Sequence, residues 1–207
     1  MADQETVSER FSDEDATPAR KRPRPGERRL QILQTLASML EQPGAERVTT
    51  ASLAAKIGVS EAALYRHFAS KAQMFEGLID FVDQSVIGLI RQVTDREPAG
   101  PVQASRIVAL LLQFAEKNPG MSRVMIGDAL VLEHERLQER INLLFDKIEA
   151  QLRQSLKTSD SATPTADAQV LASLLVAFMQ GRMQRFARSG FKRLPSEHLQ
   201  AALTKML

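Results

Sequence analysis

The chain has 207 residues, enough for one or two domains with a sizeable hydrophobic core. It contains no cysteine, which excludes disulfide bonds and thiolate chemistry, and no apolar run of the roughly 20 residues that a membrane span needs. The net charge is only +2, but residues 20–71 carry ten lysines and arginines against four acidic residues. Positive charge concentrated on one segment is typical of nucleic-acid binding.

The N-terminal segment predicts little folded structure. Residues 1–25 are expected to form a disordered tail, because they are strongly polar and prolines interrupt the basic run that follows the acidic start. Its basic residues suit either a DNA minor groove or nonspecific attraction to phosphate. They are Arg20, Lys21, Arg22 and Arg24. The segment lacks an apolar signal-peptide core, so we expect a cytoplasmic protein.

Residues 26–71 predict three helices with a tight turn between the second and the third. Apolar spacing predicts these helices over about 26–42, 50–57 and 61–67. Gly58 suits the left-handed conformation that ends a helix, and Ser60 suits the cap of the next one. Two short helices joined in this way are typical of a helix-turn-helix, whose second helix enters a DNA major groove.

The remaining residues predict a bundle of helices. Apolar periodicity predicts them over about 71–94, 102–117, 120–130, 137–152, 167–189 and 196–206. The run 107–112 is apolar on all sides, so its helix belongs in the middle of the bundle. No stretch alternates as a half-buried strand does. The predicted fold class is therefore all-α, with a DNA-binding domain over 26–71 and a larger helical domain over 72–207.

Nine residues of the helix-turn-helix are candidates for DNA contact. They are Thr49, Thr50, Ser60, Glu61, Ala62, Ala63, Tyr65, His67 and Lys71. One of the two threonines is expected to cap helix 50–57, and the other to touch DNA. The start of helix 61–67 is expected to read bases, since alanine accepts a thymine methyl group and glutamate accepts from cytosine. These side chains are short, so DNA shape and backbone contacts are expected to supply much of the affinity.

The same stretch resembles the TetR family of bacterial regulators. The matching pieces are Thr49, Gly58-Val59-Ser60, Leu64-Tyr65-Arg66-His67-Phe68 and Ser70-Lys71, in the family's order and spacing. The resemblance implies a homodimer on palindromic duplex DNA, with backbone contacts from Tyr65, His67 and Lys71. It also implies that the last two long helices form the dimer interface.

Four apolar residues of helix 167–189 are the candidates for that interface. They are Phe178, Met179, Met183 and Phe186. The last three continue an apolar helix face at spacings of four and three residues. We expect a monomer to expose them and a two-fold dimer to bury them, with the two recognition helices one DNA turn apart.

Longer runs resemble the nucleoid-occlusion branch of the TetR family. They are VSEAALYRHFASK, ALLLQFAEKNPGMSR, ERLQERINLLFDKIEAQLRQ and RFARSGFKRLP. This resemblance implies a factor that binds specific chromosomal sites and, when bound to DNA, antagonises the division protein FtsZ. It places the partner surface around helices 71–94 and 102–117, with Phe81, Lys117 and Asn118 as contacts. Phe81 equally suits the core, and Asn118 equally suits the end of a helix.

Other functions compete with this one. A ligand-responsive TetR-type repressor would share the DNA-binding domain, whereas a purely structural helical dimer would not need the charged motif. Helix 102–117 offers few polar groups to orient a small molecule, so we expect no small-molecule ligand and no cofactor. No residue spacing indicates catalysis or a metal site, so no enzyme is predicted. We interpret Glu133, His134 and Glu135 as a solvated surface, because consecutive helical residues face different sides.

Overall fold

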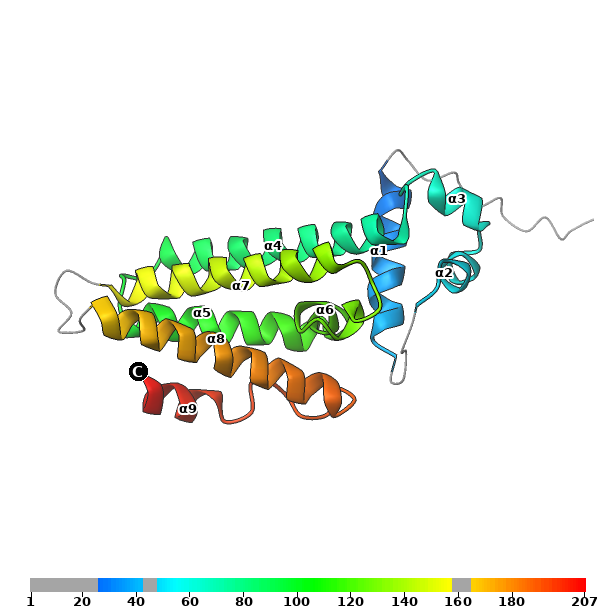
Figure 1. Cartoon of the computed structure of the whole chain (residues 1–207). Coiled ribbons are helices and arrows are strands. Elements are labelled where there is room, and N and C mark those ends of the chain that lie inside the picture. The colour runs from blue at the N-terminus through cyan, green and yellow to red at the C-terminus, as the bar shows by residue number, and fades with distance from the viewer. Residues whose placement is uncertain (1–25, 43–47, 158–164) are drawn as a thin grey trace, which may run out of the picture.

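The computed structural model describes residues 26–42, 48–157 and 165–207, and every regular element in these ranges is a helix (Figure 1). In chain order they are α1 (Glu27–Leu40), α2 (Thr50–Ile57), α3 (Glu61–Tyr65), α4 (Lys71–Thr94), α5 (Pro101–Lys117), α6 (Pro119–Met125), the 3-10 helix η1 (Asp128–Leu130), α7 (Glu135–Leu156), α8 (Thr165–Arg188) and α9 (Leu199–Met206). The predicted all-α class is confirmed, while the predicted tail over 1–25 lies outside the described residues.

Some helix ends differ from the prediction. The recognition helix α3 ends at Tyr65 rather than at residue 67, and α9 begins at Leu199 rather than at 196. The predicted helix 120–130 is two elements, because Gly127 adopts a left-handed φ of 78° between α6 and η1. Glycine takes this conformation at little cost, and it stops the continuation of an α-helix.

The molecule has two parts that share one hydrophobic core. Figure 1 shows α2 and α3 on the side of α1 that faces away from the bundle of α4 to α8. Residues of α5 and α9 line a common pocket. Leu53 of α2 and Leu64 of α3 are buried in the same core as Ile32 of α1 and Phe75 of α4. α5 packs against α4, α6, α7 and α8, which confirms its predicted central place. Among the helices of the described ranges, none combines the length and the apolar character needed to cross a membrane.

Ion pairs join the first half of α4 to α7 and to the segment just before α7. They are Lys71–Glu133, Glu76–Arg136, Asp80–Arg140 and Asp83–Lys147. We call this set the ion-pair ladder. Each partly exposed pair stabilises the fold by at most about 1 kcal/mol. Because the pairs advance in step along two parallel helices, α4 cannot slide past α7 without breaking several of them.

α6 docks the bundle onto α1. The Gly120 backbone lies so close to α1 that a methyl carbon placed on it would overlap the carbonyl oxygen of Ala37 and lie 3.0 Å from its carbonyl carbon. Next to this contact, Arg123 Nη1 donates to the carbonyl oxygen of Leu40 over 3.3 Å. The DNA-binding unit is therefore held to the bundle through α6 as well as through the continuous helix α4.

Candidate nucleic-acid interface

The start of α2 is organised by Thr49. Its hydroxyl oxygen accepts a hydrogen bond from the Ser52 amide over 3.1 Å, and the Ser52 hydroxyl oxygen accepts from the Thr49 amide over 3.1 Å. This reciprocal capping box satisfies amides that the first turn of a helix leaves unpaired. Thr49 is therefore the capping threonine of the predicted pair. Thr50, the half-buried first residue of α2, stays the predicted DNA contact.

The recognition helix α3 is placed by a tight turn and a serine cap. Gly58 has the predicted left-handed conformation, with φ of 76°, and the Ser60 hydroxyl oxygen accepts from the Ala63 amide over 3.3 Å. Leu64 anchors the inner side of α3, while Glu61 and Ala62 are exposed on its outer side. Short exposed side chains at the start of a recognition helix can approach base edges closely.

The candidate residues of α2, α3 and the turn after α3 are accessible to solvent, and we call them the DNA-facing surface after the contact predicted for them. Its members are Thr49, Thr50, Ser60, Glu61, Ala62, Ala63, Tyr65 and His67, all exposed or half-buried. Tyr65 is 46% exposed, whereas Phe68, three residues later, is buried. The surface combines hydroxyl groups and an imidazole with the start of a helix, which are groups that bind phosphate or base edges.

Lys71 has a partner that the sequence does not reveal. Its ammonium forms an ion pair with the carboxylate of Glu133, whose side chain is only 12% exposed. The interpretation of Glu133 as a solvated residue is therefore wrong. The segment before α7 folds back on the start of α4. The half-buried Glu133 carboxylate needs a cation there, and the Lys71 ammonium supplies it. An ammonium has three donors, so the predicted phosphate contact of Lys71 is compatible with this pair.

The expectation that a monomer exposes Met179, Met183 and Phe186 is wrong. All three are buried within the single chain, and the Phe186 ring packs edge-on against Phe191 with centroids 5.1 Å apart. Their face of α8 turns inward, where α8 packs against α5, α6 and α7. Phe178 is half-buried, with Arg182 over its ring.

A different line of residues faces outward on α8. The line consists of Val170, Leu174, Ala177 and Gly181, all of them exposed and spaced by four, three and four residues. We call it the outer face of α8. It combines two large apolar side chains with two small residues, and small residues allow two helix backbones to approach closely.

The three candidate partner contacts differ in their surroundings. Phe81 is 44% exposed on α4, so it is not a core residue. Lys117 is exposed at the end of α5. The Asn118 side-chain amide donates to the carbonyl oxygen of Phe114 over 2.7 Å, so this side chain closes the end of α5.

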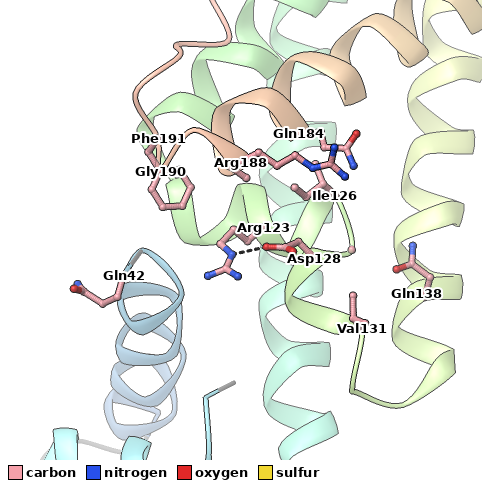
Figure 2. A pocket seen from close by; sticks show the side chains of 12 residues that line it. Gln42, Arg123, Ile126, Asp128, Val131, Gln138, Gln184, Arg188, Gly190 and Phe191 are labelled. Atoms are coloured by element: carbon pink, nitrogen blue, oxygen red, sulfur yellow. Dashed lines mark hydrogen bonds and ion pairs between the residues drawn. The ribbon is translucent and has the colours of Figure 1, made fainter. Parts of the chain in front are cut away.

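A cavity of about 620 Å³ lies where α6, η1, α7 and the end of α8 approach the end of α1 (Figure 2). Arg123 and Asp128 form an ion pair in its wall, 2.6 Å from Nε to Oδ2, and Arg188 and Phe191 also line it. No residue of the DNA-facing surface lines it. The absence of a small-molecule ligand stays a prediction. Within the described part of the chain, no cluster of three or more acidic, histidine or cysteine side chains could hold a metal ion.

Comparison with known proteins matches both parts of the chain. Residues 32–78 match the family model of bacterial regulatory proteins of the tetR family, and residues 101–206 match the SlmA-like model described as a tetracyclin repressor-like C-terminal domain. The nucleoid occlusion factor SlmA of Idiomarina loihiensis is 50% identical over 177 residues, which cover 84% of this chain and 90% of that protein. SlmA of Shewanella oneidensis is 51% identical over 174 residues, covering 83% and 88%.

Solved structures agree with the fold. A TetR-like transcriptional regulator from Rhodococcus aligns with a TM-score of 0.70 at 18% identity, covering 89% of this chain and 97% of that one. A TetR family regulator from Thermus thermophilus aligns with a TM-score of 0.67 at 20% identity, covering 86% and 94%.

The fold and the DNA-facing surface define a helix-turn-helix DNA-binding protein of the TetR type, a class of regulators and not of enzymes. Because about half of the aligned residues are identical to those of SlmA proteins over most of both chains, the protein belongs to the SlmA family of nucleoid occlusion factors within that class.

Sequence reasoning did not find two contacts near the DNA-facing surface. One is the ion pair between Glu133 and Lys71, and the other is a hydrogen bond from Arg29 of α1 to the carbonyl oxygen of His67. The partners lie 62 and 38 residues apart in the chain. Local spacing carries no signal for such pairs, because they form only after the helices have packed.

Proposed function

We propose that the protein binds specific palindromic duplex sites as a homodimer in the cytoplasm and, when bound to the nucleoid, inhibits FtsZ assembly and septum formation over the chromosome. This proposal rests on the sequence identity of about 50% to SlmA proteins, which extends over both the DNA-binding part and the C-terminal part of the chain. A single shared helix-turn-helix would support only the broader class of regulators.

DNA contact is proposed for the DNA-facing surface together with Lys71. The capping roles of Thr49 and Ser60 leave the helix starts of α2 and α3 well ordered for this contact. A domain boundary between residues 71 and 72 remains our proposal. α4 begins at Lys71 next to the DNA-facing surface and continues into the bundle as one helix.

Replacement of Thr50 should separate DNA contact from capping. We expect Thr50→Val to weaken binding to a selected duplex about five- to tenfold, because one hydroxyl contact to DNA is lost, and to leave thermal stability unchanged. Thr49→Ala should instead lower the free energy of unfolding by about 1 kcal/mol, because the capping box is lost. Fluorescence anisotropy and thermal unfolding measure the two effects. Equal loss of stability in both variants, with unchanged affinity for Thr50→Val, would contradict the assignment.

FtsZ contact is proposed for the surface around α4 and α5. Exposed Phe81 supplies an apolar group, and exposed Lys117 supplies a positive charge. The Asn118 side chain already donates a hydrogen bond to Phe114, so we expect it to contribute less to FtsZ binding than Phe81 or Lys117. A partner that uses these groups needs an apolar side chain beside an acidic one.

The ion-pair ladder supports coupling between DNA and this partner surface. Lys71 starts α4, and the pairs at Glu76, Asp80 and Asp83 fix the next three turns of α4 to α7 around the position of Phe81. A shift of Lys71 toward phosphate would therefore move α4 together with α7, and α4 would carry the shift to Phe81 of the partner surface. If coupling exists, FtsZ must tighten DNA binding by the same factor by which DNA tightens FtsZ binding.

Charge reversal at Lys117 tests the partner surface. We expect Lys117→Glu to weaken FtsZ binding by the DNA-bound protein at least tenfold, because like charges would face each other, and to change DNA affinity less than twofold. Anisotropy of labelled FtsZ with protein and duplex measures the first effect. Lys157→Glu, an exposed lysine at the end of α7, is the matched control and should bind FtsZ normally.

Two outcomes would contradict the proposal at different levels. Normal FtsZ binding by Lys117→Glu would show that Lys117 is not part of the partner surface. No binding of FtsZ by the wild-type protein with its duplex would favour the alternative of a ligand-responsive repressor. Chromatin immunoprecipitation separates these functions, since nucleoid occlusion requires many sites spread over the chromosome and a local repressor occupies a site beside the operon it controls.

A further inference from the structure

The recognition helix α3 is too short to hold its own orientation. It has five residues, and isolated helices of that length are not stable in water. At its start, Ser60 caps one amide. At its end, the amides of His67 and Phe68 both donate to the carbonyl oxygen of Leu64, over 2.9 and 3.1 Å. The direction of α3 therefore depends on what holds the turn that follows it.

Arg29 of α1 holds that turn from the other side. Its Nη1 donates to the carbonyl oxygen of His67 over 2.6 Å, and its guanidinium carbon lies 3.9 Å from the centroid of the Phe68 ring. The Phe68 ring is buried, so it offers the guanidinium a fixed platform. One side chain thus contacts the two residues that end the recognition motif, across 38 positions of sequence.

We propose that Arg29 is a positioning residue for the recognition helix: it fixes the angle of α3 against α1, so that Ser60, Glu61 and Ala62 meet the bases in one register. A guanidinium is planar, so it can stack its face on an aromatic ring while its edge donates to a carbonyl oxygen. An ammonium cannot make both contacts in this geometry. The role requires the shape of arginine and not only its charge.

Direct contact with phosphate is the competing role for Arg29, because His67 beside it is a candidate backbone contact. The two roles differ in measurable ways. Loss of one phosphate contact weakens binding to all sequences alike and reduces the salt slope of the binding constant by about 1. Loss of a positioning contact weakens specific binding more than nonspecific binding and leaves the salt slope unchanged.

The test compares Arg29→Lys and Arg29→Gln with the same two changes at Arg28. Arg28 is the matched control, because its guanidinium contacts Gln31 on its own helix, over 2.7 Å, and not the recognition motif. Each variant is titrated from about 50 to 200 mM salt. The probes are a duplex that the wild-type protein selects from a random library and a scrambled duplex of equal composition. Amide exchange of His67 and Phe68 measures the order of the turn without DNA.

We expect both Arg29 variants to bind the selected duplex about tenfold more weakly and the scrambled duplex nearly as well as wild type, at an unchanged salt slope. Both should exchange the His67 and Phe68 amides faster, and the Arg28 variants should not. Wild-type affinity for Arg29→Lys, with a lower salt slope for Arg29→Gln, would make Arg29 a phosphate contact and overturn the proposal. Equal losses on both duplexes with a large fall in thermal stability would make it a general stabilising residue and would also overturn it.

Discussion

Leu174→Glu is expected to convert the protein to a monomer and to weaken binding to its palindromic site by at least about 100-fold. Leu174 is 54% exposed in the single chain and lies in the middle of the outer face of α8. We propose that this face, with Phe178 at its edge, pairs with the same face of a second copy. A glutamate there would carry a charge into an apolar interface, and a monomer would reach only one half-site.

The small residues of the outer face support this proposed dimer interface, which we call the seam. A methyl carbon placed on Gly181 would meet nothing within 4 Å, so the packing of the single chain does not require glycine there. The open space around Gly181 allows the backbone of another helix to approach α8 closely. Together with Ala177, Gly181 lets the two copies of α8 cross near this point.

Leu143→Glu is the matched control for the dimer prediction. Leu143 is also a leucine in the middle of a helix, 58% exposed on α7, and it lies outside the proposed seam. Sedimentation velocity at micromolar concentration should show a dimer for this variant and for wild type. A dimeric Leu174→Glu would contradict the seam on α8, and a monomeric Leu143→Glu would move the seam to α7.

Gly120→Ala is expected to destabilise the protein by about 2–3 kcal/mol, which lowers the midpoint of thermal unfolding by about 5–10 °C for a chain of this size. The added methyl group would overlap the Ala37 carbonyl oxygen, and backbone atoms cannot turn aside as the end of a side chain can. α6 and α1 must then separate, which also strains the hydrogen bond from Arg123 to Leu40. We expect weaker DNA binding as well, because α1 packs against the helix-turn-helix and a shift of α1 would displace it.

Gly88→Ala is the control for this prediction. Gly88 lies within α4, and a methyl carbon placed there would meet nothing within 4 Å, so alanine should leave stability unchanged or raise it by up to about 1 kcal/mol. Thermal unfolding at one fixed protein concentration measures both variants, since dimer formation makes the midpoint depend on concentration. Wild-type stability of Gly120→Ala would show that α6 does not press on α1 in solution.

The local features of the helix-turn-helix could be predicted from the sequence because they depend on neighbouring residues. Gly58 ends α2 in the left-handed conformation, and Ser60 caps α3 three residues from the amide it serves. Leu64 and Phe68 are both buried, although Phe68 lies in the turn after α3 and not in the helix that the spacing of four residues predicts. The all-α class and the central place of α5 follow from the same short-range periodicity.

The orientation of α8 was decided by tertiary packing. Large apolar residues occur on more than one side of this helix, so periodicity alone does not select the face that turns inward. The bundle buries Met179 and Met183, opposite to the expectation for a monomer, and it leaves Val170 and Leu174 exposed. The free energy of burial depends on which neighbours a side chain meets, and the sequence of one helix does not contain that information.

The contacts that order the surroundings of the recognition helix also arise only in the folded chain. Arg29 meets His67 and Phe68, and Glu133 meets Lys71, across long separations in sequence. The sequence by itself therefore determined the helices, apart from some of their ends, and the caps of the helix-turn-helix. Tertiary structure decided how those helices are held and which face of α8 stays exposed, because distant side chains become neighbours only when the core of α1, α4 and α7 has formed.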